Sequence, residues 1–88
     1  MSKKKLPTRC AIVTHYDEAT GNKLESVYFK EGSKIRHRTY INGEHFGYKT
    51  DTVYKAYSDE PYIRECGHYW KITGDDLLAV RSLTQIPH

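Results

Sequence analysis

Membrane spans and secretion signals are the first features that this 88-residue sequence lacks. Its apolar runs are far shorter than the roughly 20 residues that cross a bilayer, so we expect no membrane partner. The charged N-terminus, MSKKKLPTRC, has no apolar segment of the secretory kind, which predicts a cytoplasmic protein. Only two cysteines are present, and in that compartment Cys10 and Cys66 are expected to be reduced thiols.

Metal-binding and catalytic patterns are missing as well. Cys66 and His68 are too close in sequence for a standard pair of zinc ligands, and Cys10 and His15 stand alone. Side chains at positions 66 and 68 of a tight turn diverge, and no third group is available to orient them, which argues against a cysteine nucleophile. No phosphate-binding loop occurs. We therefore expect no enzyme activity, no metal and no cofactor.

Hydrophobic residues are scarce, at 38% of the chain, and this limits the size of any core. The length fits one domain and leaves no room for two. Much of the core must come from the eight tyrosines and the single tryptophan, since a tyrosine ring can be buried while its hydroxyl stays hydrated. Charged residues of both signs make up 28%, which argues against disorder. We predict a single domain over residues 9–86, after a disordered basic lead-in at 1–8.

Basic residues are concentrated in two segments, although the net charge of +3 is modest. Residues 1–9 contain four basic side chains and no acid. In residues 34–41, KIRHRTYI, the alternation of a strand would place four side chains on one face: Lys34, Arg36, Arg38 and Tyr40. Such a mixture of basic and aromatic side chains is typical of nucleic-acid surfaces, and it also occurs on ordinary solvated faces.

Strand patterns dominate the first half of the chain. Residues 10–16 and 23–30 are rich in β-branched and aromatic residues and flank a turn at Gly21-Asn22, which predicts a β-hairpin. The Asn42-Gly43 pair allows two interpretations. Either it is a hairpin turn, and strand structure continues to residue 50, or it belongs to a helix-turn-helix that leads into a helix.

Helical patterns are confined to the second half. Residues 50–58, TDTVYKAYS, fit a short helix with Thr50 or Asp51 as its cap. Residues 62–72 fit a tight hairpin centred on Cys66-Gly67. A second helix should begin within 73–77, because Thr73 can cap it and two aspartates follow at its positive end. The predicted core of this half consists of Trp70, Ile72, Leu77 and Val80.

The predicted fold class is therefore α+β. We expect a small single domain in which one or more N-terminal β-hairpins are followed by a short helix, a wing-like hairpin and a C-terminal helix.

Four short motifs within residues 46–80 add a resemblance to this pattern. They are Phe46-Gly47, Thr52-Val53-Tyr54-Lys55, Gly67-His68-Tyr69-Trp70-Lys71-Ile72 and Asp76-Leu77. Together they resemble the winged helix-turn-helix modules of phage excisionases and the related MerR-like DNA-binding domains. The resemblance implies that the helix with the Thr-Val-Tyr motif enters the major groove, while the following hairpin forms a wing along the phosphates.

This resemblance implies a small non-catalytic DNA-binding accessory or regulatory protein of the phage or mobile-element type. Its partners would be double-stranded DNA and a recombinase or another host or phage protein. The predicted DNA-binding residues lie on the first helix, the wing and the basic strand: Lys49, Thr50, Thr52, Lys55, Arg64, His68, Lys71, Arg36 and Arg38. The alternative is a phage-type inhibitor or adaptor that caps a host protein through a tyrosine-rich surface, since tyrosine is also enriched at protein interfaces.

Overall fold

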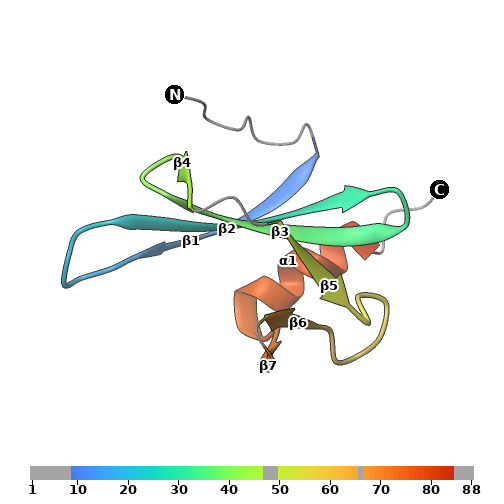
Figure 1. Cartoon of the computed structure of the whole chain (residues 1–88). Helices are drawn as coiled ribbons and strands as arrows, with labels where there is room; N and C mark the ends of the chain where they lie inside the picture. The colour runs from blue at the N-terminus through green and yellow to red at the C-terminus, as the bar shows by residue number, and fades with distance from the viewer. Residues whose placement is uncertain (1–8, 47–49, 66, 85–88) are drawn as a thin grey trace.

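The computed structural model describes residues 9–46, 50–65 and 67–84, and most of its regular structure is antiparallel sheet (Figure 1). Within these ranges, seven strands precede one helix: β1 (Cys10–Tyr16), β2 (Lys23–Glu31), β3 (Lys34–Ile41), β4 (Glu44–His45), β5 (Asp51–Tyr54), β6 (Tyr62–Glu65), β7 (His68–Lys71) and α1 (Gly74–Thr84). The strand order is β1-β2-β3-β5-β6-β7, and β4 pairs with β3 off this path. No helix in the described ranges has the length and apolar character needed to cross a bilayer.

The turn between β3 and β4 shows how the sequence fixes the strand pairing. Asn42 and Gly43 have φ values of 51° and 86°, as the two central residues of a type I′ hairpin turn require. The Asn42 amide donates a 2.8 Å hydrogen bond to the Lys23 carbonyl, and its side-chain Oδ1 accepts one of 2.9 Å from the Lys23 amide. The turn is therefore attached to the start of β2.

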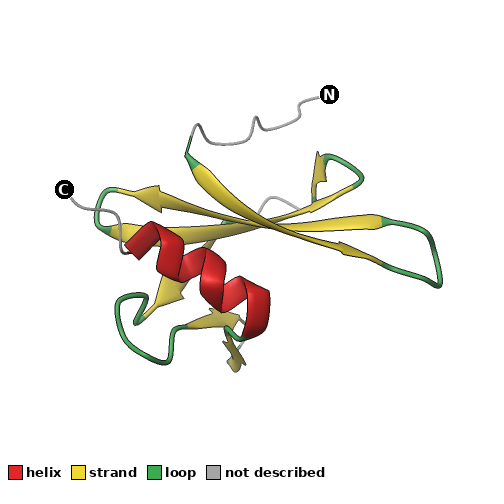
Figure 2. Cartoon of the chain, turned by 180° about the vertical axis from the view of Figure 1, so that it is seen from behind, coloured by secondary structure: helices red, strands yellow, loops and turns green. Residues whose placement is uncertain are grey.

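The alternation of side chains along the strands gives the sheet a helix-covered face and an open face (Figure 2). Helix α1 packs on β1 and β2 and encloses the main core with the helix-covered face. This core contains Val13, Tyr28, Ile35, Val53, Ala56, Ile63, Ile72, Ala79, Val80 and Leu83. A second, smaller cluster lies on the open face of β1–β3 and contains Val27, Phe29, Tyr40 and the partly buried Cys10.

The predicted α+β fold with a helix-turn-helix is wrong. Residues 51–54 of the expected helix at 50–58 form strand β5, whose Thr52 and Val53 pair with Arg36 and Ile35 of β3. After β5 the chain turns at Lys55, whose φ of 53° lies outside the helical range. The Asn42-Gly43 pair forms the hairpin turn of the first interpretation. In the described ranges, the fold is instead an antiparallel β-sheet with one C-terminal helix.

The predicted N-terminal hairpin, the hairpin after residue 61 and the C-terminal helix are confirmed, whereas the predicted lead-in at 1–8 lies outside the described residues. The N-terminal hairpin is β1–β2, the hairpin after residue 61 is β6–β7, and α1 begins at Gly74. Pairing with β3 overrides the helical spacing of residues 50–58, because Val53 must face the core and Tyr54 must face away.

The predicted core of the second half is confirmed at Ile72 and Val80, confirmed in part at Leu77, and wrong at Trp70. Ile72 and Val80 are buried, at 6% and 0% exposure, and Leu77 is partly buried against the core. Trp70 is 60% exposed. Its strand, β7, is at one edge of the sheet, whereas α1 packs on β1 and β2 at the opposite edge. The helix therefore does not cover the Trp70 side chain.

Candidate functional site

Three tyrosines form a continuous row on the open face of β5, β6 and β7. The Tyr54 and Tyr62 rings are stacked, with centroids 5.5 Å apart and planes at 22°. Tyr62 meets Tyr69 edge to face, at 5.0 Å and 63°. The row arises from the strand pairing. Tyr54 of β5 pairs directly with Tyr62 of β6, and Tyr69 of β7 is a diagonal neighbour of Tyr62 on the same face. Tyr54 and Tyr69 are 44% and 66% exposed, so the row presents ring surface to solvent.

Three basic side chains surround this tyrosine row. Lys71 pairs with Tyr62 across β6 and β7, and the Arg64 guanidinium lies 5.8 Å from the centroid of the Tyr69 ring. Lys55 follows Tyr54 and lines a depression of about 140 Å³ with Glu60, Tyr62, Tyr69 and Lys71. Within the described ranges, no ion pair joins Lys55, Arg64 or Lys71 to an acid. Their charges are therefore available to an anionic ligand.

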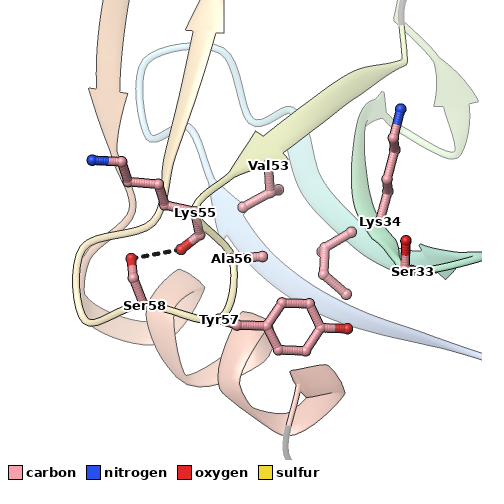
Figure 3. A pocket seen from close by; sticks show the side chains of 8 residues that line it. Ser33, Lys34, Val53, Lys55, Ala56, Tyr57 and Ser58 are labelled. Carbon is pink, nitrogen blue, oxygen red and sulfur yellow. Dashed lines mark hydrogen bonds between the residues drawn. The ribbon is translucent and has the colours of Figure 1, made fainter.

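The turn after β5 orients Lys55 toward the tyrosine row. The Ser58 hydroxyl and amide both donate to the Lys55 carbonyl, at 2.7 and 3.0 Å. Figure 3 shows the first of these bonds at the edge of a larger hollow of about 430 Å³. The Tyr57 ring points across this hollow, whereas the Lys55 side chain points away from it. Ile35, Val53 and Ala56 contribute apolar lining to the hollow, which offers little chemistry.

The two predicted arginines of β3 lie on the same open face but are already bonded within the protein. Arg36 donates to a Glu31 carboxylate oxygen at 3.0 Å and to the carbonyls of Asp51 and Thr50 at 3.2 and 3.1 Å. Arg38 donates to the Thr50 hydroxyl at 3.0 Å, and its guanidinium lies 4.6 Å from the Phe29 ring centroid. These bonds attach the start of β5 to β3.

The predicted DNA-binding residues are therefore only partly brought together. Lys55, Arg64 and Lys71 surround the tyrosine row, whereas His68 lies on the opposite face of β7 by strand alternation. Lys49 lies outside the described residues. The half-buried Thr50 and Thr52 lie beside the two arginines. The predicted site residues include none of the three tyrosines. The period-two alternation of a strand would have placed Tyr54 on the same face as Thr52, and Tyr69 on the same face as Lys71.

A second cluster of titratable side chains lies beneath α1. The Tyr28 hydroxyl donates a 2.6 Å hydrogen bond to Asp76, and His15 lies 3.8 Å from the other oxygen of that carboxylate. The His37 Nδ1 atom is 3.2 Å from Asp51 Oδ2, and its ring centroid is 4.8 Å from that of Tyr28. Burial, together with the bond to Asp76, raises the pKa of Tyr28 well above its ordinary value. This cluster joins the sheet to α1, which is a structural role.

Metal and thiol chemistry find little support in the described ranges. No group of three or more potential His, Cys, Asp or Glu ligands occurs there. Burial raises the pKa of the Cys10 thiol, which lowers the fraction of reactive thiolate.

No protein-family model, curated protein or solved structure matches this chain. A functional assignment must therefore rest on the chemistry of the tyrosine row and the charges around it.

Proposed function

We propose that this protein is a small, non-catalytic nucleic-acid-binding protein that binds single strands on the open face of β5–β7. The observation that supports this proposal is the row of Tyr54, Tyr62 and Tyr69, which lies next to three basic side chains without acidic partners in the described ranges. Unpaired bases stack on exposed aromatic rings, and phosphates bind to neighbouring lysine and arginine side chains. We place this activity in the cytoplasm.

A single strand suits this surface better than a duplex. Bases in a duplex are stacked on one another, so their faces are not free to meet Tyr54 or Tyr69. Recognition in the major groove commonly uses a helix or a two-stranded ribbon that inserts into it. The expected helix at 50–58 is replaced by β5, which lies within the sheet between β3 and β6.

The test is a comparison of Tyr69→Ala with Trp70→Ala in binding to labelled oligothymidylate. These neighbours on β7 have similar exposure, 66% and 60%, but lie on opposite faces of the strand. Tyr69→Ala should weaken binding by about 1–3 kcal/mol, the usual contribution of one stacked base. Trp70→Ala should leave the affinity unchanged. Fluorescence anisotropy measures both, with the matched duplex as a weaker competitor.

The basic side chains give a second measurement on the same complex. Three phosphate contacts predict that log K falls against log salt concentration with a slope of about −2 for a single strand. Arg64→Ala and Lys71→Ala should each reduce that slope by about 0.7. Arg81→Ala removes the same charge from α1, away from the tyrosine row, and should leave the slope unchanged. An affinity for oligothymidylate that Tyr69→Ala leaves intact would contradict the proposal.

A protein-binding inhibitor or adaptor is the second candidate function. It is favoured by the exposure of Tyr57 and Trp70, at 57% and 60%, outside the tyrosine row. Aromatic side chains of this kind are enriched at protein interfaces. This candidate predicts no binding to oligothymidylate at low salt and a host-protein complex that Trp70→Ala weakens.

A further inference from the structure

Strand β1 forms one edge of the sheet that the structure describes. It lies at one end of the strand order, and no strand in the described ranges pairs with its outer side. Its seven residues, CAIVTHY, include no lysine, arginine, acid or proline, and all seven pair with β2 in unbroken register. Sheet edges of this length are normally protected by charges, prolines or bulges, because outward-facing N–H and C=O groups can accept another strand.

Exposed aliphatic side chains flank this edge on both faces of the sheet. Ile12 projects from the open face at 40% exposure, and Leu78 of α1 lies on the helix-covered side at 67%. They are the two large aliphatic residues that are exposed in the described ranges, where the other exposed large hydrophobic residues are aromatic. Leu78 also lines a hollow of about 370 Å³ between β1 and α1.

The opposite edge of the sheet differs in each of these respects. Strand β7 has four residues, His68–Lys71, and it ends in a lysine. The exposed side chains on its two faces are aromatic or basic. Among the described strands, only β1 is an edge strand of seven residues that carries no lysine, arginine or acid and has exposed aliphatic side chains on both sides.

We propose that β1 pairs in antiparallel fashion with β1 of a second copy of this chain. An identical strand suits this edge because β1 carries no lysine, arginine or acid, so the two paired strands bring no such side chains of like charge against each other. Antiparallel pairing of identical strands requires a two-fold axis perpendicular to the sheet, which keeps the two open faces on the same side. Pairing centred on Val13 places Ile12 opposite Thr14 of the second copy. The apolar side chains of Ile12 and Leu78 then cover the junction from its two faces.

The oligomeric state of the full chain tests this proposal. Sedimentation velocity over a range of protein concentrations should show a monomer–dimer equilibrium. Ile12→Lys and Leu78→Glu should each raise the dimer dissociation constant at least about tenfold, because each adds a charge at the junction. Both residues are exposed, so both variants should fold, which circular dichroism and thermal melting verify. His68→Lys, at the opposite edge, should leave the dissociation constant unchanged.

A double variant tests the register. In pairing centred on Val13, Ile12→Lys combined with Thr14→Glu places each introduced lysine opposite the introduced glutamate of the other copy. The double variant should therefore regain much of the dimer that Ile12→Lys loses. A wild-type chain that stays monomeric at all concentrations would overturn the proposal, and so would a dimer that neither Ile12→Lys nor Leu78→Glu weakens.

Discussion

Tyr28 connects the sheet to helix α1. Its ring is 2% exposed in the main core, and its hydroxyl reaches Asp76 in the first turn of α1. The two residues are 48 positions apart in the chain. A tyrosine suits this position better than a phenylalanine, because the ring fills the core while the hydroxyl donates to a carboxylate in the first turn of the helix.

Tyr28→Phe should lower the free energy of unfolding by about 1–2 kcal/mol, since it removes a partly buried hydrogen bond and keeps the ring. Urea unfolding at neutral pH measures the change. Tyr16→Phe is the matched control, because the Tyr16 side chain is 69% exposed and should be insensitive to the loss of its hydroxyl. Equal stabilities of the two variants would show that the bond to Asp76 contributes nothing.

Helix α1 stabilises the molecule through one face and leaves another in solvent. Ala79, Val80 and Leu83 are buried against the sheet, while Leu78 is 67% exposed. Asp75 and Asp76 lie at the positive end of the helix dipole, and Arg81 lies in the last turn, where a positive charge is favourable. The guanidinium of Arg81 also lies 3.5 Å from Asp59, which connects the helix to the loop between β5 and β6.

Two leucines of α1 offer a matched pair of substitutions. Leu83→Ala should destabilise the fold by about 2–5 kcal/mol, because it leaves a cavity in the core. Leu78→Ala should change the stability by no more than about 0.5 kcal/mol at protein concentrations where the chain is monomeric. Thermal or urea unfolding of both variants measures the difference. A larger loss for Leu78→Ala would mean that the helix packs through a different face.

Elements with a strong local signal could be predicted from the sequence. The N-terminal hairpin and α1 follow from Gly21 and the aspartates after Thr73, which act on neighbouring residues, whereas the Asn42-Gly43 pair left two interpretations open. Strand β5 could not be predicted in this way, because its four residues become a strand through pairing with β3 and β6. The tyrosine row depends on that same pairing, so the candidate site was predicted only in its basic residues.

At the scale of the whole molecule, the sheet is close to a meander. Most strands pair with the strand that precedes or follows them in the chain, and only the small β4 interrupts the sequence order. The last element, α1, packs against the first two strands, β1 and β2, and so joins the two ends of the described chain. The hydrogen bond from Tyr28 to Asp76 is one of the contacts between the sheet and α1. The protonation state of the Tyr28 hydroxyl therefore affects the stability of the entire fold.

The stability of the whole chain should therefore fall in alkaline solution. Tyr28 has a raised pKa in the folded state, whereas in the unfolded chain it returns to about 10.0. As the pH rises through that value, the unfolded state releases the proton first and is thereby stabilised relative to the folded state, so this contribution is complete below pH 10 and is lost above it. Unfolding by urea between about pH 8 and 11 should show a steeper loss for the wild type than for Tyr28→Phe. Parallel curves would contradict this assignment.

The position of Trp70 has a practical consequence for spectroscopy. It is the only tryptophan in the chain, and it lies in solvent on β7, facing away from the tyrosine row. Indole emission responds to the polarity around the ring, and that polarity changes little when an already exposed side chain unfolds. The intrinsic fluorescence of this protein should therefore be red-shifted in the native state and insensitive to denaturation. Near-ultraviolet circular dichroism of the coupled Tyr54, Tyr62 and Tyr69 rings would report the loss of the folded structure instead.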